Sequence, residues 1–223
     1  ADKRQCVFEL VYYAHPASTV FGHRVGRFRQ ELGRKLEEEF GLPESEIVLG
    51  IPDSANFIAM GFGASGSSGE YYPAINRHHY VGRTFIAANQ ADRDEEVANK
   101  FTFSAEEIAG KIVVLIDDSI VRGTTLRKVI AVMRSMNAKE VHVRVASPPF
   151  RHPCRYGINT KSYEELIANQ KTIDGIREEI GADSLHYLTI EGLREVVKKP
   201  HEFCFACMNG EFWDTPTTNP PCP

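Results

Sequence analysis

The first quarter of the chain combines a helical pattern of apolar residues with two short apolar runs. Over residues 22–40, apolar side chains recur every three or four positions and charged side chains fill the opposite side, which predicts an amphipathic helix packed on a core. The aromatic and β-branched run 8–13 predicts a strand. Residues 47–51 predict a second strand, and a helix is expected over 55–61.

The clearest unit lies in the middle of the chain. Residues 112–116 are wholly apolar, as is typical of a buried parallel strand. Residues 125–136 place apolar side chains on one helical face, and 141–146 predict the next strand. Strand, helix and strand in so short a stretch form a βαβ unit. The pattern therefore predicts an α/β fold with a parallel sheet flanked by helices.

The remaining stretches are less regular. Residues 64–69 are rich in Gly and Ser and predict a flexible loop, whereas 80–86 suit a strand or part of a lid. The polar stretch 87–100 has little apolar periodicity and is a candidate for the rest of that lid. The tail after Thr215 is Pro-rich and is expected to be disordered. Beyond residue 149 the pattern becomes helical, over 163–168, 173–180 and 190–197.

Composition narrows the class of protein. The chain has 223 residues, 42% hydrophobic and 25% charged, as expected for a soluble globular domain. The net charge of -4 and the scattered basic residues argue against nucleic-acid binding, and no apolar run is long enough for a membrane span. Five cysteines without a secretory signal argue for a reducing compartment, the cytoplasm. The chain starts without Met, so it is either a processed protein or a piece of a longer one.

Two acids and a Gly-Thr-Thr sequence follow the central apolar strand. Asp117 and Asp118 stand at the end of that strand, and Gly123, Thr124 and Thr125 open the next helix. Ligands of open α/β sheets bind at this edge, and glycine and a helix N-terminus together favour phosphate. The acids fit beside a phosphate if they bind sugar hydroxyls or a divalent cation. The alternative is that both acids only cap the helix or face solvent.

The sequence of this segment resembles a known motif. Residues 112–125 read Ile-Val-Val-Leu-Ile-Asp-Asp-Ser-Ile-Val-Arg-Gly-Thr-Thr, which resembles the phosphoribosyl pyrophosphate motif of type I phosphoribosyltransferases. Together with segments such as 51–54, 80–86, 141–149 and 180–184, it is similar to the glutamine phosphoribosylpyrophosphate amidotransferases (amidophosphoribosyltransferases) of purine biosynthesis.

The resemblance continues in order to about residue 210 and implies an architecture. The expected fold is the type I phosphoribosyltransferase fold, a mostly parallel twisted sheet flanked by helices, with a C-terminal helical region. The expected domains are a phosphoribosyltransferase domain over 1–214 and a flexible tail over 215–223. The family's N-terminal glutaminase domain has no counterpart in the chain, so we expect only the phosphoribosyltransferase half.

The resemblance also implies an activity and its residues. The family uses magnesium to transfer the phosphoribosyl group of phosphoribosyl pyrophosphate to ammonia, a glycosyltransferase (pentosyltransferase) reaction that yields phosphoribosylamine and pyrophosphate. Arg83, Asp117 and Asp118 are the implied catalytic residues, and Ser54, Asp117 and Asp118 the implied magnesium ligands. The implied substrate-binding residues are Asp53, Ser54, Tyr80, Gly82, Asp117, Asp118, Ser119, Val121, Arg122, Gly123, Thr124 and Thr125.

Four of the cysteines match the iron–sulfur-containing branch of that family. Cys204 and Cys207 alone form a weak signal, half a zinc site or a chance spacing. With Cys6 and Cys154 they fall at the positions of the four ligands of a [4Fe–4S] cluster, which would act as a structural staple. Zinc on the same thiolates and unliganded buried cysteines are the competing interpretations. Cys222 has no counterpart and is expected to be a free thiol.

Departures from the family leave the nitrogen acceptor open. Glutamine hydrolysis is not expected, so the nitrogen would come from free ammonia or from a separate glutaminase subunit. Near the pyrophosphate and the lid, Arg77-His78-His79 replaces the usual Lys-Asn-Arg, and Ala98 stands where a cation is usual. Transfer to another amine and a non-catalytic module that binds phosphoribosyl pyrophosphate are therefore the alternatives. Homo-oligomers are expected by resemblance alone.

Overall fold

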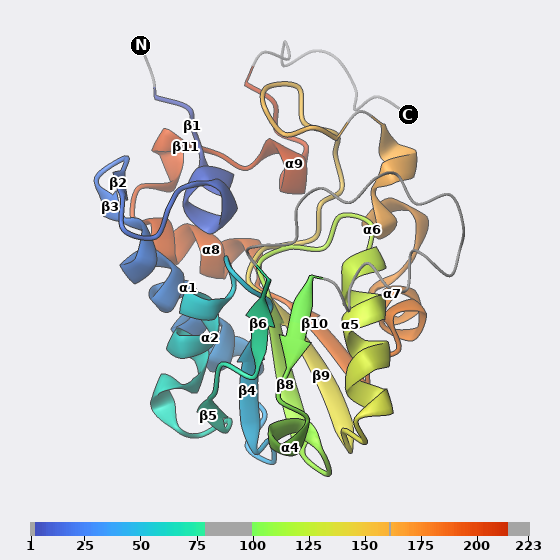
Figure 1. The fold of residues 1–223 in the computed structure, drawn as a ribbon. Coiled ribbons are helices and arrows are strands. Elements are labelled where there is room, and N and C mark those ends of the chain that lie inside the picture. The colour runs from blue at the N-terminus through green and yellow to red at the C-terminus, as the bar shows by residue number, and fades with distance from the viewer. Residues whose placement is uncertain (1–2, 79–99, 161, 214–223) are drawn as a thin grey trace.

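A parallel sheet forms the centre of the computed structural model, which describes residues 3–78, 100–160 and 162–213. Its five strands are all parallel and run in the order β10-β9-β8-β4-β5 (Figure 1). The predicted parallel α/β sheet is thus confirmed. The strands are β4 (Ile47–Gly50), β5 (Glu70–Tyr71), β8 (Ile112–Asp117), β9 (Glu140–Val145) and β10 (Ser184–Tyr187).

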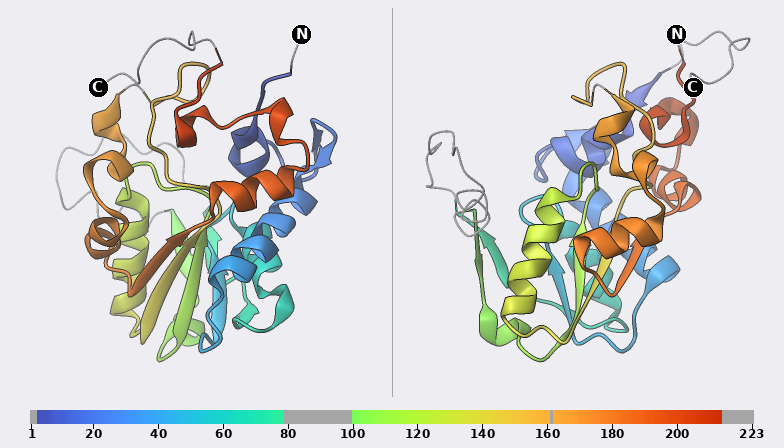
Figure 2. Two further views of the ribbon diagram at one scale, coloured as in Figure 1. Left: turned by 180° about the vertical axis from the view of Figure 1, so that it is seen from behind. Right: turned by 90° about the vertical axis from the view of Figure 1, so that its right-hand side faces the viewer.

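Helices cover both faces of this sheet (Figure 2). One face packs against α1 (Val25–Phe40), α2 (Asn56–Phe62) and α8 (Ile190–Val197). The other face packs against α5 (Thr124–Ser135) and α7 (Ile173–Ile180), with the short helices α4 (Ala105–Ile108) and α6 (Ile167–Gln170) beside them. The predicted helices over 22–40, 125–136, 173–180 and 190–197 are confirmed, although the first begins at Val25.

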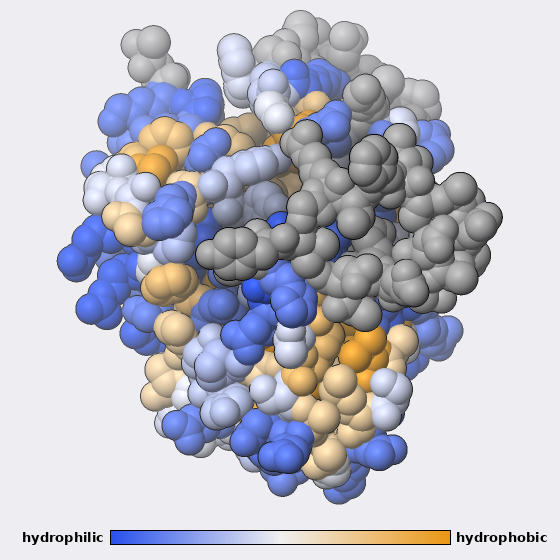
Figure 3. Space-filling model, viewed as in Figure 1, coloured by the Kyte–Doolittle hydropathy of each residue, from blue (hydrophilic) through white to orange (hydrophobic). Residues whose placement is uncertain are grey.

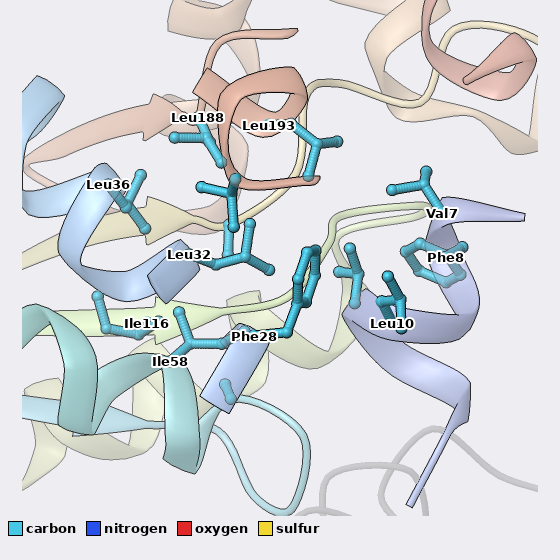
Figure 4. Close-up of a cluster of buried hydrophobic side chains, with 14 of the residues drawn as sticks. Val7, Phe8, Leu10, Phe28, Leu32, Leu36, Ile58, Ile116, Leu188 and Leu193 are labelled. Carbon is cyan, nitrogen blue, oxygen red and sulfur yellow. The ribbon is translucent and has the colours of Figure 1, made fainter. Parts of the chain in front are cut away.

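Strand β8 explains why its sequence is wholly apolar. Its side chains alternate between two cores, because successive residues of a strand point to opposite faces. Val114 and Ile116 enter the core beneath α1 and α2, which Figure 4 shows with Phe28, Leu32 and Ile58. Val113 and Leu115 enter the core beneath α5 and α7. A strand buried on both faces needs apolar side chains at every position.

Three short two-stranded ribbons surround the sheet. β2 (Thr19–Val20) and β3 (His23–Arg24) form a hairpin before α1, and β6 (Ile75–Arg77) pairs with β7 (Phe101–Phe103). β1 (Gln5–Cys6) pairs in parallel with β11 (Phe203–Cys204), so segments near the two ends of the chain lie side by side. The short helices are η1 (Glu9–Tyr13), η2 (Gly63–Ser65), η3 (Tyr163–Glu165), η4 (Pro200–Glu202) and α9 (Ala206–Asn209).

The predicted strand over 8–13 is wrong, because the chain forms the π-helix η1 there. Val7, Leu10 and Val11 are buried three or four positions apart, a helical spacing hidden within a dense apolar run. The side chain of Arg29 binds carbonyl oxygens at the end of this helix, which an extended strand would not gather in one place.

Two further differences concern the loop at 64–69 and the C-terminal part. The Gly/Ser-rich loop contains Ser68, which is fully buried and donates to Glu37 Oε1 at 3.1 Å, so part of the loop is packed. The C-terminal part forms the edge strand β10 as well as helices. The sequence pattern predicts only helices there, because a strand of four residues is too short to show a period.

The surface and the helix lengths add two observations. Apolar side chains gather over β7, α4 and α5 on the face drawn in Figure 3, with hydrophilic side chains around them. None of the described helices is long and apolar enough to cross a membrane. The expected lid over 80–86 and the Pro-rich tail lie outside the described residues.

Candidate active site

The carboxyl ends of β4 and β8 open into a cavity of about 640 Å³. Because parallel strands end at the same edge of a sheet, residues far apart in sequence meet there. β4 is followed by Ser54, and β8 by Asp118 and the loop into α5. Of the residues expected to form the site, the cavity wall includes Ser54, Asp117, Asp118, Ser119, Val121, Arg122, Gly123, Thr124 and Thr125.

Asp118 is held by two hydroxyl groups. Its side chain is 4% exposed, and its Oδ1 accepts a hydrogen bond from Ser119 Oγ at 2.6 Å. Its Oδ2 accepts from Ser54 Oγ, so the loop after β4 is tied to the loop after β8. The adjacent backbone N–H of Asp118 donates to Asp117 Oδ1 at 2.9 Å. These bonds fix the orientation of both carboxyl groups at the floor of the cavity.

Arg29 lies behind the acid pair and was not expected from the motif. Its guanidinium, on a residue 2% exposed, donates to the carbonyl oxygens of Leu10, Tyr12 and Ala14 at 3.0, 2.7 and 2.9 Å. Its positive charge also acts on Asp118. The sequence did hold a signal, because Arg29 interrupts the apolar stripe of the helix over 22–40.

The two carboxyl groups resist ionisation in the free protein. Burial and then the charge of neighbouring Asp118 raise the pKa of Asp117 well above its ordinary value. Burial also raises the pKa of Asp118, while the hydrogen bonds from Ser119 and Ser54 and the charge of Arg29 act in the opposite direction. A buried acid pair of this kind gains most from a bound cation or from donors on a ligand.

The loop before α5 lines the same cavity and leads into the N-terminus of that helix. Gly123 caps α5 with φ of 73°, a left-handed conformation that glycine adopts without steric cost. The first turn of the helix starts at Thr124 and Thr125, both exposed, and the helix dipole favours an anion there. Arg122 forms an ion pair with Glu165, which secures the outer side of the loop.

Basic residues complete the wall. Arg77, Lys100 and Lys128 all line the cavity, facing the acid pair and the α5 loop. Asp53 does not line it; its Oδ2 is 3.5 Å from Nη1 of Arg77. His78 is exposed, and its Nε2 lies 2.7 Å from Thr102 Oγ1. The other predicted site residues, Tyr80, Gly82 and Arg83, lie outside the described residues, as does the position of Ala98.

A second cavity, of about 590 Å³, brings the four predicted cysteine ligands together. Its wall includes Cys6, Cys154, Cys204 and Cys207. Cys6 and Cys204 are register partners of the β1–β11 ribbon, and the Cys207 carbonyl accepts the N–H groups of Arg151 and His152 at 2.9 and 3.0 Å. Three segments distant in sequence therefore converge on one space.

Backbone N–H groups surround the cysteine sulfurs. Cys154 Sγ accepts from the N–H groups of Tyr156, Gly157 and Ile158 at 3.4, 3.5 and 3.4 Å. Burial raises the pKa of Cys6 and of Cys207, so both thiols hold their protons when no cation is near. Within residues 3–78, 100–160 and 162–213, no three His, Cys, Asp or Glu side chains stand close enough to hold a single metal ion.

Comparison with known proteins agrees with this geometry. Residues 72–178 match the model of the phosphoribosyl transferase domain. The amidophosphoribosyltransferase of Bacillus subtilis is 40% identical over 212 residues, which cover 93% of this chain and 44% of that protein. Amidophosphoribosyltransferase 1, chloroplastic, of Arabidopsis thaliana is 42% identical over 217 residues, covering 97% of this chain and 38% of that protein.

A solved structure extends the similarity to three dimensions. The glutamine phosphoribosylpyrophosphate amidotransferase from B. subtilis, complexed with ADP and GMP, superposes with a TM-score of 0.86 at 38% identity, over 96% of this chain and 49% of that chain. The chain thus spans less than half the length of the curated relatives it matches. The parallel sheet, the acid pair at its edge and these similarities together identify the fold of the chain as the type I phosphoribosyltransferase fold.

Proposed function

We propose that the chain transfers the phosphoribosyl group of phosphoribosyl pyrophosphate to ammonia, releasing pyrophosphate. The observation that carries the proposal is the pairing of buried Asp118 and half-buried Asp117 with a glycine-capped helix start in one cavity. Amidophosphoribosyltransferases 40–42% identical to the chain support the reaction class. In this assignment, the loop from Ser119 to Thr125 binds the 5-phosphate, and Asp117 and Asp118 bind the ribose hydroxyls.

Phosphoribosyl transfer to ammonia depends more on stabilising developing charge than on proton transfer. The bond between ribose C1 and the pyrophosphate oxygen breaks, the electron pair leaves with pyrophosphate, and the ammonia nitrogen then bonds to C1 and loses a proton. Positive charge develops on the ribose beside Asp117 and Asp118. Negative charge develops on pyrophosphate, toward which Arg77 and Lys100 in the cavity wall can act. We also assign Arg83, beyond the described residues, to the leaving group.

A magnesium ion fits the donor set of this cavity. Asp117, Asp118 and Ser54 offer the oxygen ligands that magnesium prefers, and magnesium commonly uses one or two carboxylates together with substrate phosphates. Bound there, the ion would supply Lewis-acid stabilisation to the departing pyrophosphate. The hydrogen bonds from Ser119 and Ser54 orient Asp118, and the N–H of Asp118 orients Asp117.

Pyrophosphate release tests the proposal. Anaerobically purified protein with magnesium and phosphoribosyl pyrophosphate is compared with ammonium, with glutamine and without an acceptor, and Asp117→Asn is the control variant. We expect ammonium-dependent release that the substitution abolishes. Release with glutamine only after a glutaminase is added would show that the chain uses ammonia and does not itself hydrolyse glutamine. Tight substrate binding without release under every condition would overturn transfer to ammonia, in favour of transfer to another amine or of a binding module.

We further propose that Cys6, Cys154, Cys204 and Cys207 hold a [4Fe–4S] cluster. The four thiols line one cavity of about 590 Å³. Four cysteine thiolates are the usual ligand set of such a cluster, and they can also hold zinc. The N–H groups that donate to Cys154 Sγ also suit a ligating thiolate, whose negative charge they would stabilise.

Metal analysis separates the two occupants without an activity assay. After anaerobic purification we expect about four iron and four sulfide per chain and a broad absorption band near 400 nm, all lost in Cys207→Ser. One zinc per chain, with no sulfide, would overturn the cluster assignment.

A further inference from the structure

Tyr187 is a buried titratable residue that the proposed reaction does not use. It closes β10 with a side chain 7% exposed, and its hydroxyl has no hydrogen-bond partner in the structure. Leaving a buried hydroxyl unpaired destabilises the folded state, and a phenylalanine at the same place would avoid that cost. A tyrosine at this position therefore calls for an explanation.

The sheet register places Tyr187 on the same face as Asp117. Tyr187 is the partner of Val145, and Val145 is in turn the partner of Asp117. Residues in register across parallel strands point to the same face, and their strands lie about 4.8 Å apart, so the two Cα atoms are about 10 Å apart. The two side chains stand off this face with only Val145 between them, and the charge of Asp117 acts on Tyr187. A small molecule between the two side chains would contact both.

The charges around the hydroxyl polarise it in one direction. Burial raises the pKa of Tyr187, Arg151 opposes this rise, and Asp117 adds to it. A phenol hydroxyl that both a cation and an acid influence can accept a hydrogen bond from the cation and donate one to the acid. Tyr187 is therefore disposed to donate toward Asp117.

A second buried hydroxyl lies at the same end of the sheet. Ser147 is fully buried, its Oγ has no partner, and it stands two residues beyond Val145. These are the only two buried side-chain N or O atoms without a partner among the described residues. Buried polar groups that lack protein partners commonly share an ordered water, which needs at least two of them.

We propose that Tyr187 is a positioning residue for Asp117, to which its hydroxyl donates through one buried water that Ser147 also binds. The water and Tyr187 would fix the angle at which the Asp117 carboxylate meets the ribose hydroxyls. This role rests on the proposed function, because it assigns Asp117 to the substrate. Tyr187 itself does not line the cavity, so it acts only through Asp117.

Tyr187→Phe removes the hydroxyl and keeps the ring, and Tyr71→Phe, on β5 of the same sheet, is the matched control. We expect Tyr187→Phe to raise the KM for phosphoribosyl pyrophosphate about 10-fold, as loss of such an outer partner commonly does, with a much smaller change in kcat and no loss of thermal stability. Ser147→Ala should shift KM in the same direction. Tyr71→Phe should leave KM unchanged.

A crystal structure of the wild-type protein makes the test independent of activity. We expect an ordered water within hydrogen-bond distance of Tyr187 and Asp117, absent or displaced in Tyr187→Phe. No such water, or an unchanged KM in Tyr187→Phe, would overturn the positioning role. If the water is present but the wild-type protein neither binds nor turns over phosphoribosyl pyrophosphate, the proposed function fails while the Tyr187–Asp117 link stands.

Discussion

Arg29 joins two parts of the molecule that the sequence separates. One guanidinium binds carbonyl oxygens of Leu10, Tyr12 and Ala14, and its charge acts on Asp118. Burial lowers the pKa of Arg29, and the charge of Asp118 opposes that change, so the arginine and the acid support each other's charged forms. The position of η1 and the electrostatics of the cavity thus depend on the same side chain.

Replacing Arg29 with methionine should strongly destabilise the fold. The change leaves buried carbonyl oxygens without donors and Asp118 without its buried cation, which costs about 3–5 kcal/mol. For a chain of this size that cost lowers Tm by about 6–20 °C, measured by thermal unfolding. Arg27→Met, an exposed position on the same helix, is the control and should change Tm little. Equal Tm values for the two variants would contradict the role given to Arg29.

Asp117→Asn should make the free protein more stable while it removes activity. Because the pKa of Asp117 is raised in the folded state, ionising it costs stability, and the stability of the magnesium-free protein falls as pH rises through that raised pKa. Asparagine removes this dependence. A gain of about 1 kcal/mol corresponds to about 2–4 °C in Tm.

The measurement is Tm against pH from 5 to 8 in the presence of a chelator. Asp174→Asn, at a carboxyl group 89% exposed, is the control and should follow the wild type. A lower Tm for Asp117→Asn than for the wild type at the upper end of this range would show that burial does not govern the acid pair.

At the scale of elements, the turn into α5 depends on one glycine. Gly123 has φ of 73°, and a Cβ there would lie 3.1 Å from Ile167 Cδ1. Gly66 has a similar φ of 70°, but a Cβ there would meet nothing within 4 Å. An alanine at either position strains the backbone, but only an alanine at Gly123 also changes the loop that lines the cavity. Comparing the two variants therefore separates the two effects.

Gly123→Ala should weaken substrate binding, whereas Gly66→Ala should not. Each substitution costs about 1 kcal/mol of stability from the left-handed backbone. Only Gly123→Ala also shifts the N–H groups at the start of α5, so its KM for phosphoribosyl pyrophosphate should rise several-fold. Steady-state kinetics and thermal unfolding of both variants test this prediction. An unchanged KM in Gly123→Ala would contradict the assignment of the 5-phosphate to this loop.

Elements with a strong period were predictable from the sequence. The apolar run of β8 and the amphipathic stripes of α1, α5, α7 and α8 all appear where the pattern placed them. Elements shaped by tertiary contacts were not. The local pattern predicts a strand over η1 because it does not contain the contact that stabilises this helix. That contact comes from Arg29, nineteen residues beyond Leu10. β10 was missed because an edge strand this short has too few alternations to show a period.

The candidate site divides in the same way. Asp118, Gly123 and Thr124 sit next to one another in sequence, so a local motif suffices to predict them. Arg29, Lys128 and Tyr187 come to this edge from three separate elements, and only the fold brings them there. Arg29 alone left a trace in the pattern, as a charge within an apolar stripe.

At the scale of the whole molecule, segments near the two ends of the described chain meet at the cysteine cavity. Cys6 and Cys204 pair across the β1–β11 ribbon, and Tyr13 and Ile158 line both the cysteine cavity and the cavity of the acid pair. A cluster bound by the four cysteines would therefore brace the wall of the proposed substrate site as well as the chain ends.

Cys204→Ser should lower Tm and release the cluster, because one ligand and its cross-link are lost. Chelation of iron from the wild-type protein should lower Tm by a similar amount, since binding energy of the metal is folding energy. Cys222→Ser, at a cysteine with no place in the set, is the control and should retain iron, sulfide and Tm. If Cys204→Ser also retains all three, the staple is not formed by these four residues.

The most direct test of the central claim is a crystal structure of the protein with magnesium and phosphoribosyl pyrophosphate. The account predicts the 5-phosphate on the N–H groups between Ser119 and Thr125, and the ribose hydroxyls on Asp117 and Asp118. It also predicts the magnesium ion between the acid pair and the pyrophosphate. Substrate bound in another place, or none at this edge of the sheet at saturating concentration, would contradict it.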